Sequence, residues 1–149
     1  MRERLEKIII YTDGGSRNNP GPAAIGVVVK DSSGELITQY GETLGIATNN
    51  EAEYRAIISG IRKAKQLFGK EKIVRMGIEV RMDSKLAVEQ LSGHYKVEDA
   101  KLQPLFMQLW NLRVELGHVI TFKHIPREEN KEADKMVNQA LDAEQKQLF

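Results

Sequence analysis

The sequence predicts an α/β domain built on a five-stranded mixed sheet, an antiparallel meander plus parallel strands, with helices on both faces. Three observations support this fold class. The first part of the chain contains three short apolar runs rich in branched side chains, separated by turn-forming residues. The pattern then alternates between helical and strand-like spacing, which is typical of parallel strands joined by helices. The length of 149 residues suits one domain.

The N-terminal part of the chain predicts the antiparallel meander. Its strands are expected over Ile8–Tyr11, Ala23–Lys30 and Leu36–Tyr40. Asp13-Gly14-Gly15 and Asn19-Pro20-Gly21-Pro22 lie between the first two strands, and Asp31-Ser32-Ser33-Gly34 separates the second from the third. These are turn-forming residues, and short connections between neighbouring strands favour antiparallel pairing.

Helical spacing begins after Thr48-Asn49-Asn50. From Glu51 to Phe68 apolar residues recur every three or four positions, and Asn49 or Asn50 is expected to cap this helix. The rest of the chain continues the alternation. The expected elements are a strand over Ile73–Met82, a short helix capped by Ser84 and ending near Gly93, a helix over Asp99–Leu116, a strand over Val119–His124, and a helix from Asn130 to about Gln145.

Composition and charge exclude several classes of protein. The chain has 41% hydrophobic and 29% charged residues, a formal net charge of +1 and no cysteine. Disulfides and thiolate metal sites are therefore excluded, and nucleic-acid binding would need a local cationic patch. No apolar run approaches the roughly 20 residues that span a bilayer, and the N-terminus lacks a secretory apolar core. We expect a monomeric, cytoplasmic protein without membrane contact. It should form one domain over residues 1–149, with flexible ends at 1–6 and about 146–149.

Four acidic residues occupy unusual positions in the predicted fold. Asp13 and Asp83 follow apolar strands, Glu53 shares the apolar face of a helix, and Asp134 lies one turn into the last helix. Each has an ordinary explanation. Asp13 suits an Asp-Gly turn, Asp83 suits local capping, Glu53 suits a helix-end charge at the rim, and Asp134 suits an ion pair on a polar helix face. Glu51, two positions before Glu53, should point away from the sheet and be solvated.

Taken together, the four carboxylates favour a metal site. Two of them end strands that can be neighbours, and the other two begin helices that should pack over the same edge of the sheet. Clustered carboxylates repel one another unless cations neutralise them. Oxygen ligands of this kind suit Mg²⁺, with Mn²⁺ as a possible substitute. Two such ions can activate water and stabilise the leaving oxygen of a phosphodiester, so the pattern predicts metal-dependent phosphodiester chemistry.

The residues that form this pattern resemble the type 1 ribonuclease H family. The matching segments are Tyr11-Thr12-Asp13-Gly14-Gly15, Asn19-Pro20-Gly21-Pro22, Thr48-Asn49-Asn50-Glu51-Ala52-Glu53, Met82-Asp83-Ser84, and Asn130 with Ala133-Asp134. Their order and spacing match from about Lys7 to Ala140. The resemblance implies the ribonuclease H-like fold, a five-stranded mixed sheet with flanking helices, which agrees with the element order predicted above.

The resemblance also implies an activity and a site. Members of the family hydrolyse the RNA strand of RNA/DNA hybrids and leave a 5′-phosphate and a 3′-hydroxyl. By the match, the metal-binding catalytic residues are Asp13, Glu53, Asp83 and Asp134. The candidate substrate-binding residues are Gly14, Asn19, Thr48, Asn49 and Asn50. In the absence of a basic protrusion, Lys85 is a further candidate, for contact with a phosphate. The asparagines match residues that read the minor groove, where short amides can donate to and accept from 2′-hydroxyls. Thr48 matches a residue that holds a DNA-strand phosphate.

The sequence departs from many family members in two places. The basic protrusion that many members carry is replaced by Gly93–Lys101, which is short and weakly charged and matches the protrusion-lacking branch. The loop before the last helix offers His124 and Arg127 as candidate catalytic side chains. Because His124 continues the strand face of Ile120 and Phe122, we expect it to be packed. Arg127 is then the candidate mobile cation.

Other functions fit parts of the same pattern. A polynucleotidyl transferase or resolvase would share the fold, but the chain shows no added DNA-binding segment. An inactive hybrid-binding module would gain affinity by losing carboxylates near phosphate, yet all four are present. A small-molecule phosphatase or a structural cation site would use the same carboxylates. The sequence therefore predicts a metal-dependent endonuclease acting on RNA/DNA hybrids, with these functions as alternatives.

Overall fold

The structure is a computed structural model that describes residues 7–148. The strands of this part of the chain are β1 (Ile8–Ser16), β2 (Gly21–Lys30), β3 (Leu36–Ala47), β4 (Ile78–Met82) and β5 (Ile120–His124). Its helices are α1 (Asn49–Phe68), α2 (Lys70–Met76), α3 (Lys85–Leu91), α4 (Gln103–Glu115), the short 3-10 helix η2 (Arg127–Glu129) and α5 (Lys131–Leu148).

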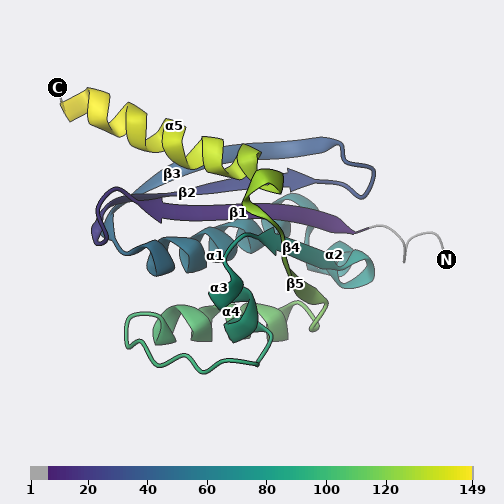
Figure 1. Cartoon of the computed structure of the whole chain (residues 1–149). Helices are drawn as coiled ribbons and strands as arrows, with labels where there is room; N and C mark the ends of the chain where they lie inside the picture. The colour runs from purple at the N-terminus through teal and green to yellow at the C-terminus, as the bar shows by residue number, and fades with distance from the viewer. Residues whose placement is uncertain (1–6, 149) are drawn as a thin grey trace.

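The five strands form one mixed sheet in the order β3-β2-β1-β4-β5. Strands β1, β2 and β3 pair antiparallel, whereas β4 pairs parallel with both β1 and β5. Helix α1 packs on one face of the sheet with α3 and α4 beyond it, and α5 crosses the opposite face (Figure 1). The predicted five-stranded mixed sheet with helices on both faces is therefore confirmed.

The main core lies between the sheet and α1. It includes Ile57 and Ile61 of α1 with Ile10 and Val27 of the sheet, all fully buried. On the other face, α5 lies so close to the sheet that a Cβ at Gly26 would be 2.1 Å from the carbonyl oxygen of the helix above it. Only a residue without a side chain permits this approach, so the glycine determines how closely α5 packs over β2.

Two strands are longer than the sequence predicts. Strand β1 runs through Asp13-Gly14-Gly15 to Ser16, because these residues pair with β2 rather than turning away from it; Asp13, for example, lies opposite Gly26. Strand β3 continues to Ala47 because β2 offers pairing partners along its whole length. The sequence places the ends of these strands too early, because pairing with a neighbouring strand overrides the local preference of these residues for a turn.

A helix that the sequence analysis missed lies before β4. The strand expected over Ile73–Met82 is divided into α2, which ends at Met76, and β4, which begins at Ile78. Gly69 and Gly77, both with positive φ, bound α2, whose one buried side chain is that of Ile73. The expected helix over Asp99–Leu116 also begins later, at Gln103.

The chain ends differ in part from the expectation of flexibility. Residues 1–6 and 149 lie outside the described residues, whereas residues 146–148 continue helix α5. Within residues 7–148, no helix combines the length and the apolar character that a membrane crossing requires.

Candidate active site

The four predicted carboxylates line one hollow of about 450 Å³. Asp13 comes from β1, Asp83 follows β4, Glu53 lies in the first turns of α1, and Asp134 lies in the first turn of α5. These elements are far apart in the sequence and meet just beyond the residues over which β1 pairs with the parallel strand β4. Other predicted residues that line the hollow are Gly14, Asn49, Asn50 and Arg127.

Gly14 brings the first turns of α1 against β1. A Cβ at this position would lie 2.3 Å from the backbone carbonyl carbon of Ala52 and 2.4 Å from the amide nitrogen of Glu53. Any side chain would push the helix away, so this glycine is what allows Glu53 to lie beside Asp13. The Gly14 amide also donates a hydrogen bond to Oδ1 of Asp13 (3.0 Å). Its substrate-binding role stays a prediction, and the structure adds this packing role.

Thr48, rather than Asn49 or Asn50, caps helix α1. Its hydroxyl accepts from the Glu51 amide, and the Glu51 carboxylate accepts from the Thr48 amide, each at 3.1 Å. The expectation that Glu51 is simply solvated is therefore wrong, because this reciprocal pair holds the side chain against the helix terminus. The arrangement leaves the side chains of Asn49 and Asn50 free of the capping role.

Asn130 connects the residues around three of the carboxylates. Its side chain is buried, and Nδ2 donates to the carbonyl of Thr12 (2.9 Å), next to Asp13, and to Oδ2 of Asp83 (3.4 Å). Its own carbonyl accepts from the Asp134 amide (3.1 Å). Asn130 belongs to one of the segments that resemble the family, but its sequence context predicts no role for it. A polar residue at the start of a helix gives no local sign that its amide reaches two strands.

Burial and mutual repulsion raise the pKa values of two of the carboxylates. Burial, and then the nearby Asp83, Asp134 and Glu53 charges, raise the pKa of Asp13 from 3.8 to about 8. Burial likewise raises the pKa of Glu53 from 4.5 to about 7, with Asp83 adding to the increase and Ser84 and Arg127 opposing it. Carboxyl groups that hold protons near neutral pH ionise readily when a cation approaches them.

The residues present fit a divalent cation by their chemistry. All four are carboxylates, and the buried Oε2 of Glu53 has no hydrogen-bond partner among residues 7–148. In that same part of the chain, no group of three or more His, Cys, Asp or Glu side chains is already arranged to hold a metal ion.

The predicted substrate-binding residues fall into two groups. Asn19 and Asn49 are joined directly, because the backbone amide of Asn49 donates to the side-chain Oδ1 of Asn19 (3.0 Å). Oδ1 of Asn49 accepts from the amide and hydroxyl of Ser16 (2.8 and 3.2 Å), so its Nδ2 is the side-chain group left for a ligand. Lys85 is exposed at the start of α3, two residues after Asp83, outside the lining of the hollow.

The structure separates His124 from Arg127. Arg127 lines the hollow and is close enough to Glu53 to lower its pKa. His124 was expected to be packed, but it is exposed at the end of β5, and the neighbouring Ile125 is buried instead. That expectation is wrong because the alternation of strand faces ends with β5, where only Ile120 is fully buried and Phe122 is half-buried.

Comparison with known proteins identifies the family. The reverse transcriptase-like family matches residues 11–140. Ribonuclease HI of Halobacterium salinarum is 37% identical over 146 residues, which cover 94% of this chain and 67% of that protein. The chain belongs to the type 1 ribonuclease H family. The crystal structure of LC11-RNase H1 in complex with an RNA/DNA hybrid matches with a TM-score of 0.88 and 45% identity, over 92% of this chain and 98% of that one.

Relatives of greater length contain more than this domain. A protein of Mycobacterium tuberculosis named as bifunctional is 41% identical over 138 residues, which cover 92% of this chain but 36% of that protein. The chain thus spans about a third of the length of such mycobacterial relatives.

Proposed function

We propose that this chain hydrolyses the RNA strand of RNA/DNA hybrids and leaves a 5′-phosphate and a 3′-hydroxyl. The observation that carries the proposal is the convergence of four carboxylates in one hollow that is also lined by Asn49 and Asn50. Family membership supports it, as does the hybrid bound to the related LC11-RNase H1. The catalytic carboxylates are Asp13, Glu53, Asp83 and Asp134.

These four residues would hold divalent metal ions, which family membership implies. We propose two Mg²⁺ ions in the presence of substrate, with Mn²⁺ as a substitute. When bound, the ions supply an activated water and neutralise charge at the scissile phosphate. Asp13 and Glu53 would release their protons as the ions bind, since burial and nearby unneutralised charge raise the pKa values of these two groups.

The chain's own polar groups would orient the hybrid. The amides of Asn19, Asn49 and Asn50 would contact 2′-hydroxyls and base edges in the minor groove, which distinguishes RNA from DNA. The Arg127 guanidinium, which lines the hollow, would reach a phosphate oxygen and assist turnover. Thr48 and Lys85 would contact backbone phosphates next to the site.

We also propose that the enzyme is a monomer acting in the cytoplasm. All four proposed catalytic carboxylates come from one chain, from β1, α1, the end of β4 and α5, which supports a monomer. The molar mass measured by light scattering during gel filtration tests whether the protein is a monomer.

The direct test is hydrolysis of an end-labelled RNA/DNA hybrid in Mg²⁺, with single-stranded RNA, duplex RNA and duplex DNA of the same sequence as controls. We expect cleavage of the hybrid's RNA strand, 5′-phosphate products, and no cleavage after chelation. Equal rates on hybrid and duplex DNA would contradict the proposed 2′-hydroxyl contacts. Hybrid binding without any cleavage would favour an inactive binding module.

A matched pair of variants tests the carboxylate assignment. Glu53→Gln removes a charge from the hollow and should lower the cleavage rate on the order of a hundredfold or more. Glu51→Gln makes the same change two residues earlier on α1, where the amide oxygen can still accept from the Thr48 amide, so activity should stay within about twofold. If Glu53→Gln kept the wild-type cleavage rate and Glu51→Gln lost activity, the assignment of Glu53 as a catalytic carboxylate would be refuted.

A further inference from the structure

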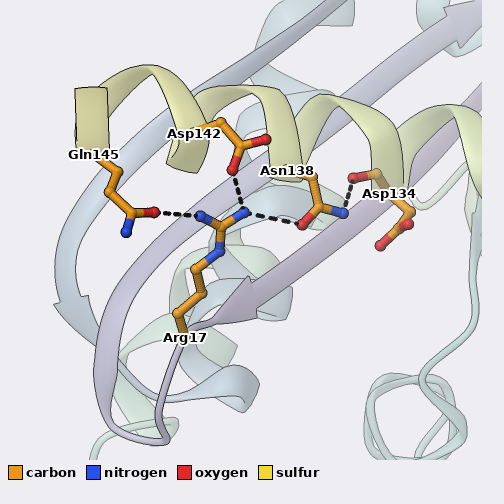
Figure 2. Close-up of polar contacts among 5 residues, drawn as sticks. All are labelled: Arg17, Asp134, Asn138, Asp142 and Gln145. Carbon is orange, nitrogen blue, oxygen red and sulfur yellow. Dashed lines mark hydrogen bonds and ion pairs between the residues drawn. The ribbon is translucent and has the colours of Figure 1, made fainter. Parts of the chain in front are cut away.

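The turn between β1 and β2 is held to helix α5 by one arginine. The guanidinium of Arg17 donates to Oδ1 of Asp142 (2.7 Å), Oε1 of Gln145 (3.0 Å) and Oδ1 of Asn138 (3.4 Å), as Figure 2 shows. The three acceptors lie on successive turns of one helix face. A planar guanidinium with fixed donor directions is suited to hold several acceptors at once.

The same turn carries Asn19, one of the proposed substrate contacts. Residues Asn18, Asn19 and Pro20 are exposed, so burial does not hold this segment in place. Instead, the turn is fixed on one side by the bond from the Asn49 amide to Asn19, and on the other side by Arg17. Backbone pairing of Arg17 with Pro22 (2.8 Å) closes its base. The side-chain bonds therefore decide where Asn19 stands relative to α1 and α5.

We propose that Arg17 is a positioning residue that holds Asn19 in place to contact the RNA/DNA hybrid. This inference rests on the proposed function. Arg17 itself lines the hollow, but its guanidinium is engaged by Asp142, so its effect reaches the hybrid through the turn that carries Asn19. Both side chains remain partly exposed. Asn138 extends the network by donating to the Asp134 carbonyl (3.1 Å). The Asp134 amide is separately held by Asn130, so loss of Arg17 should affect hybrid affinity more than turnover.

Another ion pair provides a matched control. Lys30, at the far end of β2 from this turn, donates to Oε1 of Glu132 at 2.7 Å and also joins the sheet to α5. If Arg17 only helped to attach the helix, then Lys30→Ala and Arg17→Ala would behave alike. If Arg17 holds Asn19, only the Arg17 variant should alter hybrid binding.

The experiment compares Arg17→Ala, Asp142→Ala, their double variant and Lys30→Ala in the full chain. The dissociation constant of a fluorescent hybrid is measured by anisotropy in EDTA at fixed salt, and KM and kcat are measured in Mg²⁺. Arg17→Ala and Asp142→Ala should each weaken binding and raise KM about two- to fivefold, with kcat within about twofold. The double variant should be no worse than either single one, and Arg17→Lys should restore part of the loss. Lys30→Ala should leave hybrid affinity unchanged, and its Tm should be close to that of Arg17→Ala.

Three results would overturn the inference. Equal loss of affinity in Lys30→Ala would show a general effect of attaching α5. Weaker binding in Arg17→Ala with normal binding in Asp142→Ala would show that Arg17 contacts phosphate directly. Unchanged affinity in both Arg17→Ala and Asp142→Ala would remove the positioning role. A wild-type chain that neither binds nor cuts the hybrid would instead refute the proposed function.

Discussion

Replacing Asp13 with Asn should stabilise the protein in metal-free buffer while abolishing its proposed activity. Asp13 lies among three other carboxylates, and burial together with their charges raises its pKa from 3.8 to about 8. Because the pKa is higher in the folded state than in the unfolded state, ionisation opposes folding. The contribution of Asp13 to stability is greatest below its unfolded pKa of 3.8 and is lost as the pH rises through the folded value of about 8. The amide keeps the shape of the side chain without its charge.

The size of the effect follows from the pKa difference. From 3.8 to about 8 is roughly four pKa units. At about 1.4 kcal/mol per unit, the largest destabilisation on full ionisation is about 6 kcal/mol. The Asn amide is itself desolvated at this position, and the carboxylate can turn toward the open hollow. We therefore expect about a third of that value, ~2 kcal/mol, which raises Tm by about 4–8 °C in a domain of this size.

The assay is thermal unfolding followed by circular dichroism in EDTA, from about pH 4.5 to about pH 9. The Tm difference between Asp13→Asn and wild type should be small at the acid end and should reach its full value above the folded pKa of about 8. Glu35→Gln, which changes an exposed carboxylate, is the control and should show no such trend. Mg²⁺ should stabilise wild type more than the variant. A lower Tm for Asp13→Asn at high pH, or a gain independent of pH, would refute this account.

Three further predictions concern Asn130, Arg127 and His124. Asn130→Ala should lower the free energy of unfolding by about 2 kcal/mol and reduce hybrid cleavage, because the buried side-chain amide donates to the carbonyl of Thr12 and to Asp83. Chemical denaturation measures the first effect and a cleavage assay the second. A variant with wild-type stability and activity would contradict the prediction. Arg127→Ala should lower kcat several-fold with little change in Tm, since the side chain is exposed yet lines the hollow. His124→Ala should change the free energy of unfolding by less than about 0.5 kcal/mol, because the residue is exposed. If His124→Ala lowered kcat and Arg127→Ala did not, the roles assigned to these two residues would be reversed.

Features that depend on neighbours in the sequence could be predicted from the sequence. Ser84 caps α3 by accepting from the Ala87 amide, as expected for a hydroxyl placed before a helix. Glu53 lies on the helix face whose later residues Ile57 and Ile61 are buried, because a period of 3.6 residues determines which positions share a face. The order of the five strands along the chain was predicted from the same local periodicities. These features require only the geometry of a helix turn or a strand.

Features that depend on distant partners were decided by the tertiary structure. Strand β1 passes through Asp13-Gly14-Gly15 because β2 pairs with it there, although those residue types favour a turn. His124 is exposed because the buried position passes to Ile125 once the strand ends. Arg17 finds its three acceptors 121 to 128 residues further along the chain. A local pattern carries no information about such contacts, because whether a side chain is buried, paired or free depends on which surface the folded chain brings against it.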